Sequence, residues 1–231
     1  MRPESSEVTY LGIGCYTVPE AARLLRAPAL NIRRWLGGYT YRDHDSKTAM
    51  PPLWATQIPQ IEEQLLLGFR DLIELRFVLA FLNAGLGLKT IRACIEYARL
   101  CVGDDRPFST RRFQTDGKTI FLEAADRDDG LLDLRSKQYA IRQVIEQSFR
   151  DLDMEKNTVV RWRPYRGKGS IVVDPARSLG QPIAARSGVP TIAMADAVIA
   201  EGSHQAAARV FEVPISVVRD AVAFERSMLT A

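Results

Sequence analysis

Residues 16 to 41 read YTVPEAARLLRAPALNIRRWLGGYTY, which predicts a helix, a tight turn, a second helix and a strand. Thr17 can cap the first helix, and Glu20 stands three residues later, where its carboxylate can return a hydrogen bond to the cap. Pro19 falls in the first turn, where a missing N–H costs nothing. The pair Ala27-Pro28 separates the helices, because proline fits the first position of a new helix.

The second helix has two unlike faces. Steps of about 100° per residue bring together the apolar residues Ala29, Ile32, Trp35 and Leu36. The opposite face carries Leu30, Asn31, Arg33 and Arg34. Arginine can bind phosphates or guanine edges, asparagine can pair with adenine, and leucine can touch a thymine methyl group. This face therefore suits the major groove of DNA, and an ordinary helical hairpin with a solvated basic face is the alternative.

Two runs, Tyr16–Ala22 and Ala27–Trp35, resemble the N-terminal helix-turn-helix of the MerR and excisionase superfamily. In that family the positions matching Arg33 and Arg34 face DNA, and the position matching Trp35 is usually aromatic. The resemblance covers the first quarter of the chain. It implies DNA binding, with Thr17 included in the predicted DNA-binding set, and it names no target sequence.

A wing is expected after the second helix. The pair Gly37-Gly38 ends that helix, and residues 39–42 alternate like a strand. Residues 43–48 form a polar loop, after which Leu53–Ala55 can return as the partner strand.

Basic residues stand near the tip of this predicted wing. Arg42, Lys47 and His44 can contact the phosphate backbone, which positions a protein without reading sequence. A solvated hairpin tip is the alternative. His44 lies between two aspartates and is expected to be a surface residue, not a metal ligand.

The composition is that of an ordinary globular protein. The 231 residues are 46% hydrophobic and 26% charged, which allows one large or two to three small domains. The net charge is only +3, so any nucleic-acid affinity must come from local patches. Cys15, Cys94 and Cys101 are scattered, which indicates reduced thiols in a cytoplasmic protein. Residues 1–8 do not resemble a signal peptide, and the longest apolar stretch, residues 77–88, is too short to span a bilayer.

Two helices are expected next, over residues 69–82 and from Ile91 to about Leu100, with a turn at residues 85–87. They resemble the helices that follow the wing in MerR proteins, where Gly-Leu-x-x-x-x-Ile-Arg is common. The pair is expected to be structural core and not a second DNA-binding element.

A β-hairpin is expected after the helical pair. Asp116-Gly117 is a strong signal for a two-residue hairpin turn. Residues 111–115 and 118–123 would be its strands. Residues 137–152 then form an amphipathic helix, and the polar run 153–157 is expected to end the first half of the chain.

The second half opens with basic and aromatic residues and no acid. We call Arg161, Trp162, Arg163, Tyr165 and Arg166 the basic strip. In an extended segment Arg161 and Arg163 share one face. The strip can stack on bases, grip phosphates or pair with the carboxylates of a partner. An edge strand with Pro164 on its exposed side is the alternative.

The rest of the chain predicts a short buried strand, a turn and three helices. The strand is Ile171–Val173, and the runs 180–183 and 188–191 flank the turn. The helices are expected over Thr191–Glu201, Ser203–Phe211 and Pro214–Met228, with Ser203 as a cap.

This succession, over residues 171–224, resembles a small antitoxin family whose members are partners of PIN-like toxins in type II systems of the VapBC kind. Arg186–Gly188 departs from the Gly-Thr that many relatives carry there. With the N-terminal motif, the resemblance implies a long, two-domain VapB-like antitoxin. The expected fold is mainly α with short β-hairpins, a winged helix-turn-helix over residues 1–60, a linking part over 61–155 and a C-terminal trihelical domain over 156–231.

No motif in the sequence indicates an enzyme. A nucleophile elbow, a phosphate-binding glycine loop, HExxH and paired cysteines are all missing from it, so we expect no catalytic residue, cofactor or metal.

The leading hypothesis is a cytoplasmic antitoxin that represses its own operon and neutralises a PIN-like RNase. Asn31, Arg33 and Arg34 would read the operator, while Arg42 and Lys47 would brace its backbone. One short helix makes few contacts, so a homodimer on a palindromic operator is expected. The basic strip would hold the toxin.

Two other functions fit the same sequence. One is a MerR-like regulator that senses a small molecule with its C-terminal half and has no toxin partner. The other is an RNA-binding or structural adaptor, in which residues 162–168 would carry the binding.

Overall fold

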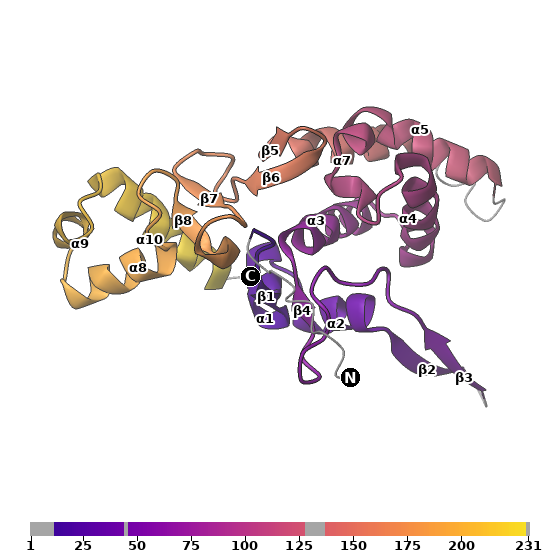
Figure 1. Ribbon diagram of the computed structural model, residues 1–231, viewed down its shortest axis with the longest axis horizontal. Coiled ribbons are helices and arrows are strands. Elements are labelled where there is room, and N and C mark those ends of the chain that lie inside the picture. The colour runs from indigo at the N-terminus through magenta and orange to yellow at the C-terminus, as the bar shows by residue number, and fades with distance from the viewer. Residues whose placement is uncertain (1–11, 44–45, 128–136, 230–231) are drawn as a thin grey trace, which may run out of the picture.

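The computed structural model describes residues 12–43, 46–127 and 137–229. Within them the fold is mainly α-helical with small antiparallel sheets. Figure 1 shows helix α3 (Phe69–Asn83) in the middle of the molecule. The N-terminal helices and a long hairpin lie on one side of it, a helical group lies at one end, and a sheet with the C-terminal helices lies at the other. One hydrophobic core runs through these parts, from Tyr16 to Met228.

The N-terminal unit begins with strand β1 (Tyr16–Thr17), which pairs with β4 (Leu66–Leu67). Helices α1 (Val18–Leu25) and α2 (Ala29–Gly37) follow. The predicted capping box is confirmed: the Glu20 N–H donates to Thr17 Oγ1 at 3.4 Å, and the Thr17 N–H donates to Glu20 Oε2 at 2.8 Å.

The hairpin after α2 consists of β2 (Tyr39–Asp43) and β3 (Ser46–Met50). Our prediction that Leu53–Ala55 is the partner strand is wrong. Pro51 and Pro52 carry no N–H, so the chain cannot continue the ladder through them.

Side chains from α3, from α4 and from the residue before η1 hold the segment after the hairpin instead. The buried carboxylate of Asp71 accepts hydrogen bonds from Trp54 Nε1 at 3.0 Å and from the Gln57 N–H at 2.7 Å. Arg92 donates to the carbonyls of Pro51 and Pro52, and Arg99 and Arg106 donate to those of Leu53 and Ala55. The backbone groups that a strand would use are therefore already bound.

The helical group consists of α4 (Leu88–Val102), the short helix η1 (Pro107–Ser109), α5 (Arg111–Arg127) and α7 (Gln138–Phe149). Helices α3, α4 and α7 agree with the predicted ones. Phenylalanine rings fill the space between them at centroid distances of 4.6–6.4 Å. The rings are Phe77, Phe81, Phe108, Phe113, Phe121 and Phe149.

The β-hairpin predicted around Asp116-Gly117 is wrong, because residues 111–127 form the single helix α5. Its buried face, made by Phe113, Gly117, Ile120, Phe121 and Ala124, repeats at helical spacing. A Cβ at Gly117 would lie 3.0 Å from the side chains of Phe113 and Ile145. The glycine therefore permits the close approach of α5 and α7 and does not form a turn.

The remaining sheet has four antiparallel strands in chain order. They are β5 (Leu152–Glu155), β6 (Thr158–Trp162), β7 (Ile171–Val173) and β8 (Pro182–Ala184), the last following the short helix η3 (Ser178–Gly180). The polar run 153–157 forms part of β5 and its turn to β6. The edge-strand alternative for the basic strip is wrong, because β6 pairs with a strand on each side.

Three helices close the chain, as predicted: α8 (Thr191–Ala200), α9 (His204–Val210) and α10 (Ile215–Leu229). Ser203 caps α9, since its hydroxyl accepts a hydrogen bond from the Ala206 N–H at 3.1 Å. None of the helices in the described ranges is long and apolar enough to cross a membrane.

The C-terminal lobe, residues 171–229, packs directly on the N-terminal unit. The buried hydroxyl of Tyr16 donates to the Gly180 carbonyl at 2.8 Å, and the Cys15 N–H donates to the Leu179 carbonyl at 3.0 Å. Gly180 has a φ of +83°, and a Cβ there would collide with the Tyr16 ring, so both turn and contact require glycine. We call this contact the Tyr16–Gly180 junction.

Candidate nucleic-acid interface

The outer face of α2 presents the residues predicted to meet DNA. Leu30 is 57% exposed, Arg33 and Arg34 are exposed, and Asn31 is half-buried. Ile32, Trp35 and Leu36 are buried on the opposite face, as the predicted helix phase requires.

The hairpin continues this surface. Arg42 and Lys47 face each other across β2 and β3, and both side chains are exposed. The guanidinium of Arg34 lies 5.7 Å from the Tyr39 ring centroid, so a cation–π contact connects α2 to the hairpin. The predicted helix and hairpin cations therefore lie on neighbouring elements. The predictions about His44 fall outside the described residues.

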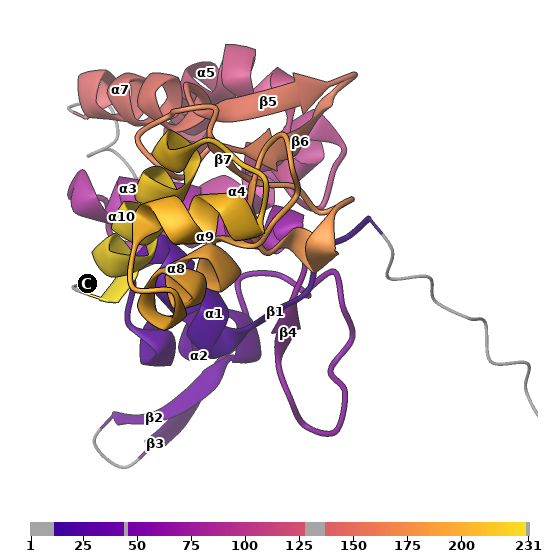
Figure 2. The same ribbon diagram turned by 90° about the vertical axis from the view of Figure 1, so that its left-hand side faces the viewer.

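A groove that the sequence did not indicate borders α2 on its other side. It has a cavity volume of about 1110 Å³ and lies between the start of α1, the end of α2 and the loop before β4. Thr17 and Arg33 line it together with Gln60 and Gln64. Figure 2 shows α2 between this loop and the β2–β3 hairpin. The polar glutamines after Pro59 were the available signal, because such side chains bind phosphates and base edges.

The cations on this surface make no ion pair among the side chains that the structure describes. Among the described side chains, which do not include those of residues 43–46 on the same hairpin, no ion pair joins Arg33, Arg34, Arg42 or Lys47 to an acid. The surface is therefore a local basic patch on a chain of small net charge, and it can attract phosphates.

The arginines of the basic strip that lie on and beside β6 have acid partners in the chain. Arg161 lies 3.2 Å from Asp174 and 3.6 Å from Asp153, and Arg163 lies 3.1 Å from Asp153. Their common partner shows that Arg161 and Arg163 share a face, as predicted.

The aromatic residues of the strip belong to the core. Trp162 is buried and donates from Nε1 to Asp151 at 3.0 Å. Tyr165 is buried with its ring edge-on to that of Phe224, at 6.2 Å. Arg166 is exposed and lies over the Tyr165 ring at 5.6 Å. Of the predicted strip, Arg166 is therefore the arginine with no acid partner among the described residues.

Buried titratable groups lie away from these surfaces. Glu74 is fully buried and accepts hydrogen bonds from the N–H groups of Phe108 and Ser109 at 3.1 and 2.7 Å. Burial raises its pKa to about 7, against which these hydrogen bonds and Arg70 act. Burial also raises the pKa of the Cys94 thiol to about 12. In the ranges that the structure describes, no three His, Cys, Asp or Glu side chains gather into a metal site.

We compared the chain with known proteins and solved structures. No family model matches it. Over 220 residues, which are 90% of this chain and 92% of its relative, the chain is 26% identical to a Mycobacterium tuberculosis protein described as "Putative antitoxin VapB45". The chain is a distant homologue of that protein.

A solved structure has the same fold along nearly its whole length. The crystal structure of Rv2018 from Mycobacterium tuberculosis matches with a TM-score of 0.71 and 25% identity, covering 90% of this chain and 96% of that one. The arrangement of the N-terminal unit, the helical group and the C-terminal lobe is therefore shared with this protein.

Proposed function

We propose that this protein is an antitoxin that binds DNA through α2 and the β2–β3 hairpin. The distant homology to a protein described as an antitoxin supports the first part. One observation carries the second: α2 and the hairpin display four cations that make no ion pair with any acid side chain that the structure describes. Cations without acid partners keep their full attraction for phosphates.

The unlike faces of α2 suggest how such binding works. Ile32 and Trp35 anchor the helix in the core, so that Asn31, Arg33 and Arg34 enter the major groove on a rigid support. Arg42 and Lys47 then lie on the flanking backbone and fix the register. One such helix reads few base pairs, so the protein acts as a two-fold dimer on a palindromic operator, and it represses its own operon by occupying the promoter.

The antitoxin part of the proposal needs a contact with a toxin, which we take to be a PIN-like RNase. The carboxylates of a metal-dependent active site attract arginine forks. Arg166 is available for this contact, whereas Arg161 and Arg163 would have to leave Asp153 and Asp174. Trp162 and Tyr165 hold the strip in place through burial.

Two measurements test the proposal separately. The chain is expressed together with the product of the neighbouring gene, and copurification is expected; it is also titrated onto its own promoter DNA in a gel shift. A chain that binds the promoter no better than an unrelated duplex of equal length would contradict the DNA-binding part.

The toxin contact has its own test. Replacing Arg161, Arg163 and Arg166 by alanine together is expected to abolish the rescue of cells that express the toxin, while promoter binding persists. Full rescue would exclude the basic strip and assign the contact to helices α8 to α10.

A further inference from the structure

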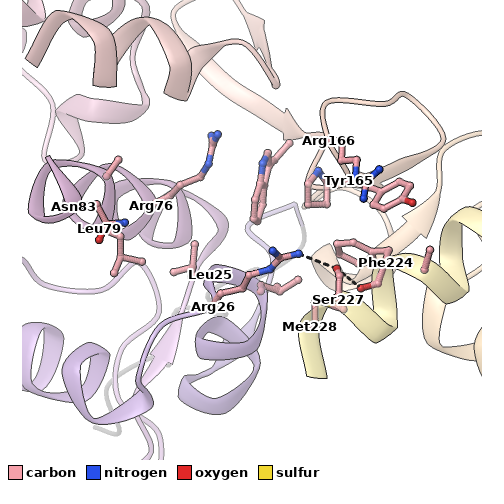
Figure 3. A pocket seen from close by; sticks show the side chains of 15 residues that line it. Leu25, Arg26, Arg76, Leu79, Asn83, Tyr165, Arg166, Phe224, Ser227 and Met228 are labelled. Carbon is pink, nitrogen blue, oxygen red and sulfur yellow. Dashed lines mark hydrogen bonds between the residues drawn. The ribbon is translucent and has the colours of Figure 1, made fainter. Parts of the chain in front are cut away.

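A cleft of about 540 Å³ lies between the N-terminal helices and α10. Helices α1 and α3 form one wall, and the turn after β6 with helix α10 forms the other (Figure 3). This volume is within the range of small-molecule sites. The cleft is separate from the outer face of α2 and from the hairpin.

The walls of the cleft combine apolar and polar surface in similar measure. Trp162, Tyr165 and Phe224 contribute aromatic surface, and Leu79 and Met228 contribute aliphatic surface. The apolar part of these walls can cover the apolar body of a small ligand.

The charged residues of the cleft are all cations. Arg26, Arg76 and Arg166 line it, and none of the described residues that line it is an aspartate or a glutamate. Arg76 is already satisfied, because it binds Asp151 at 2.6 Å and the Ser148 carbonyl at 2.8 Å.

The two other arginines, Arg26 and Arg166, make no ion pair among the described residues. Arg26 donates to the neutral hydroxyl of Ser227 at 2.8 Å (Figure 3). Arg166 lies over the Tyr165 ring and, within the described residues, makes no ion pair. Both side chains are exposed, so a ligand can reach them without breaking a salt bridge.

We propose that this cleft binds a small amphipathic organic anion, namely a carboxylate or phosphate monoester attached to an aromatic or aliphatic body. The apolar body lies between Leu79, Trp162 and Phe224, and the anionic group meets Arg26 and Arg166. A guanidinium binds such oxygens through two parallel hydrogen bonds and stays charged at any physiological pH. The inference does not depend on DNA binding, and it shares only Arg166 with the proposed toxin contact.

Isothermal titration calorimetry of the full chain with 1-naphthoate tests the proposal, because this probe combines an aromatic body with one carboxylate. Saturable binding at millimolar concentration is expected, and the neutral analogue 1-naphthamide should bind about tenfold more weakly or worse, since it cannot make a charge-assisted hydrogen bond.

Three variants make the test specific. The double variant Arg26→Gln/Arg166→Gln should weaken 1-naphthoate binding by about tenfold or more. The control Arg209→Gln/Arg219→Gln removes the same charge from exposed positions outside the cleft and should bind like the wild type. Ala223→Trp leaves the charge unchanged and fills the cleft from an exposed position of α10, so it should also abolish binding.

The outcomes are decisive in both directions. No heat of binding with 1-naphthoate would overturn the proposal. Equal weakening in the two double variants would also overturn it, because binding would then follow net charge and not this site. Unchanged binding in Ala223→Trp, with an unaltered thermal melt, would place the ligand elsewhere.

Discussion

The arginines of α2 and those of β6 look alike in sequence and differ in their surroundings. Arg33 and Arg34 follow an apolar residue on a helix, and Arg161 and Arg163 flank a tryptophan on a strand. The helix arginines point outward without acid partners among the described residues, whereas the strand arginines bind Asp153 and Asp174 at 3.1–3.6 Å.

The difference shows what makes a basic residue available to a partner. Asp174 is 13 residues away from Arg161 and reaches it only because β7 lies beside β6. An intramolecular acid at this distance competes with any external carboxylate or phosphate. The availability of an arginine therefore depends on its neighbours in the fold and not on its neighbours in the sequence.

The largest expected effect concerns Trp35, which anchors α2 and so supports Arg33 and Arg34. Trp35→Ala should destabilise the fold by ~3–5 kcal/mol, because truncation of a buried aromatic leaves a cavity; Trp35 is only 7% exposed. Chemical denaturation measures the change. Leu30→Ala, on the exposed face of the same helix, is the control and should change stability by about 0.5 kcal/mol at most. Equal midpoints for Trp35→Ala and the wild type would mean that α2 does not pack as described.

Glu74 is an acid whose partners differ from those of Asp153 and Asp174. It is buried, accepts hydrogen bonds from two backbone N–H groups and makes no ion pair among the described residues. Its pKa is raised from 4.5 to about 7, so its contribution to stability is fully present below pH 4.5 and is lost as the pH rises through about 7. Glu74→Gln removes this loss. The unfolding free energy of the variant minus that of the wild type should rise between these pH values by ~3 kcal/mol. A difference that stays constant with pH would show that Glu74 has an ordinary pKa.

Substituting Arg33 or Arg34 should lower the affinity for operator DNA and leave the stability of the fold unchanged. Arg33→Ala or Arg34→Ala should weaken operator binding by ~1–3 kcal/mol if the residue makes a bidentate base contact. Gel-shift titrations at fixed salt measure this loss. The matched control is Arg219→Ala, which removes an exposed arginine from α10. If both variants bind like the control while remaining folded, α2 does not face DNA.

The paired arginines should show the opposite behaviour. Asp174→Ala removes a buried carboxylate that binds Arg161 and the Ala176 N–H, so it should destabilise the fold by ~1–2 kcal/mol. It should also make Arg161 more available to an external partner, because Asp153, at 3.6 Å, is then its remaining acid partner among the described residues. A thermal melt gives the first effect, and toxin affinity gives the second. A variant as stable as the wild type would mean that the pair does not brace the sheet.

The smallest effects are expected at the hairpin. Arg42→Ala and Lys47→Ala should each weaken binding to operator and unrelated DNA alike and should reduce the salt slope of log K by about 1. Binding measured across a series of salt concentrations gives the slope. The control is Lys89→Ala, which removes an exposed lysine from α4. A loss confined to the operator would instead indicate that the hairpin reads bases.

Local patterns predicted much of the fold. The capping box at Thr17, the apolar face of α2 and the three C-terminal helices follow from spacing within one element, and the structure has them. The hairpin expected at Asp116-Gly117 was wrong. Phe113, Gly117 and Phe121 are spaced four residues apart, so a helix buries all three on one face, and this packing outweighs the preference of Asp-Gly for a turn. Two competing local patterns can be ranked only by the packing that they allow.

Long-range contacts explain what sequence reasoning missed. The path of residues 51–57 depends on Asp71, Arg92, Arg99 and Arg106, which lie on other elements. The same is true of the acid partners of the basic strip and of the groove beside Arg33. No spacing within the segment itself carries that information.

The Tyr16–Gly180 junction has a consequence for how the molecule is made. Its two residues are 164 positions apart, so the first unit to leave the ribosome gains this contact only after most of the chain has been translated. Contacts of such separation form late and slow the search for the native state. Arg26 likewise gains its hydrogen bond to Ser227 only when α10 has been made. The N-terminal helices therefore complete their packing only after α10 has been made, and a chain shortened before α10 carries an N-terminal unit that lacks part of its support.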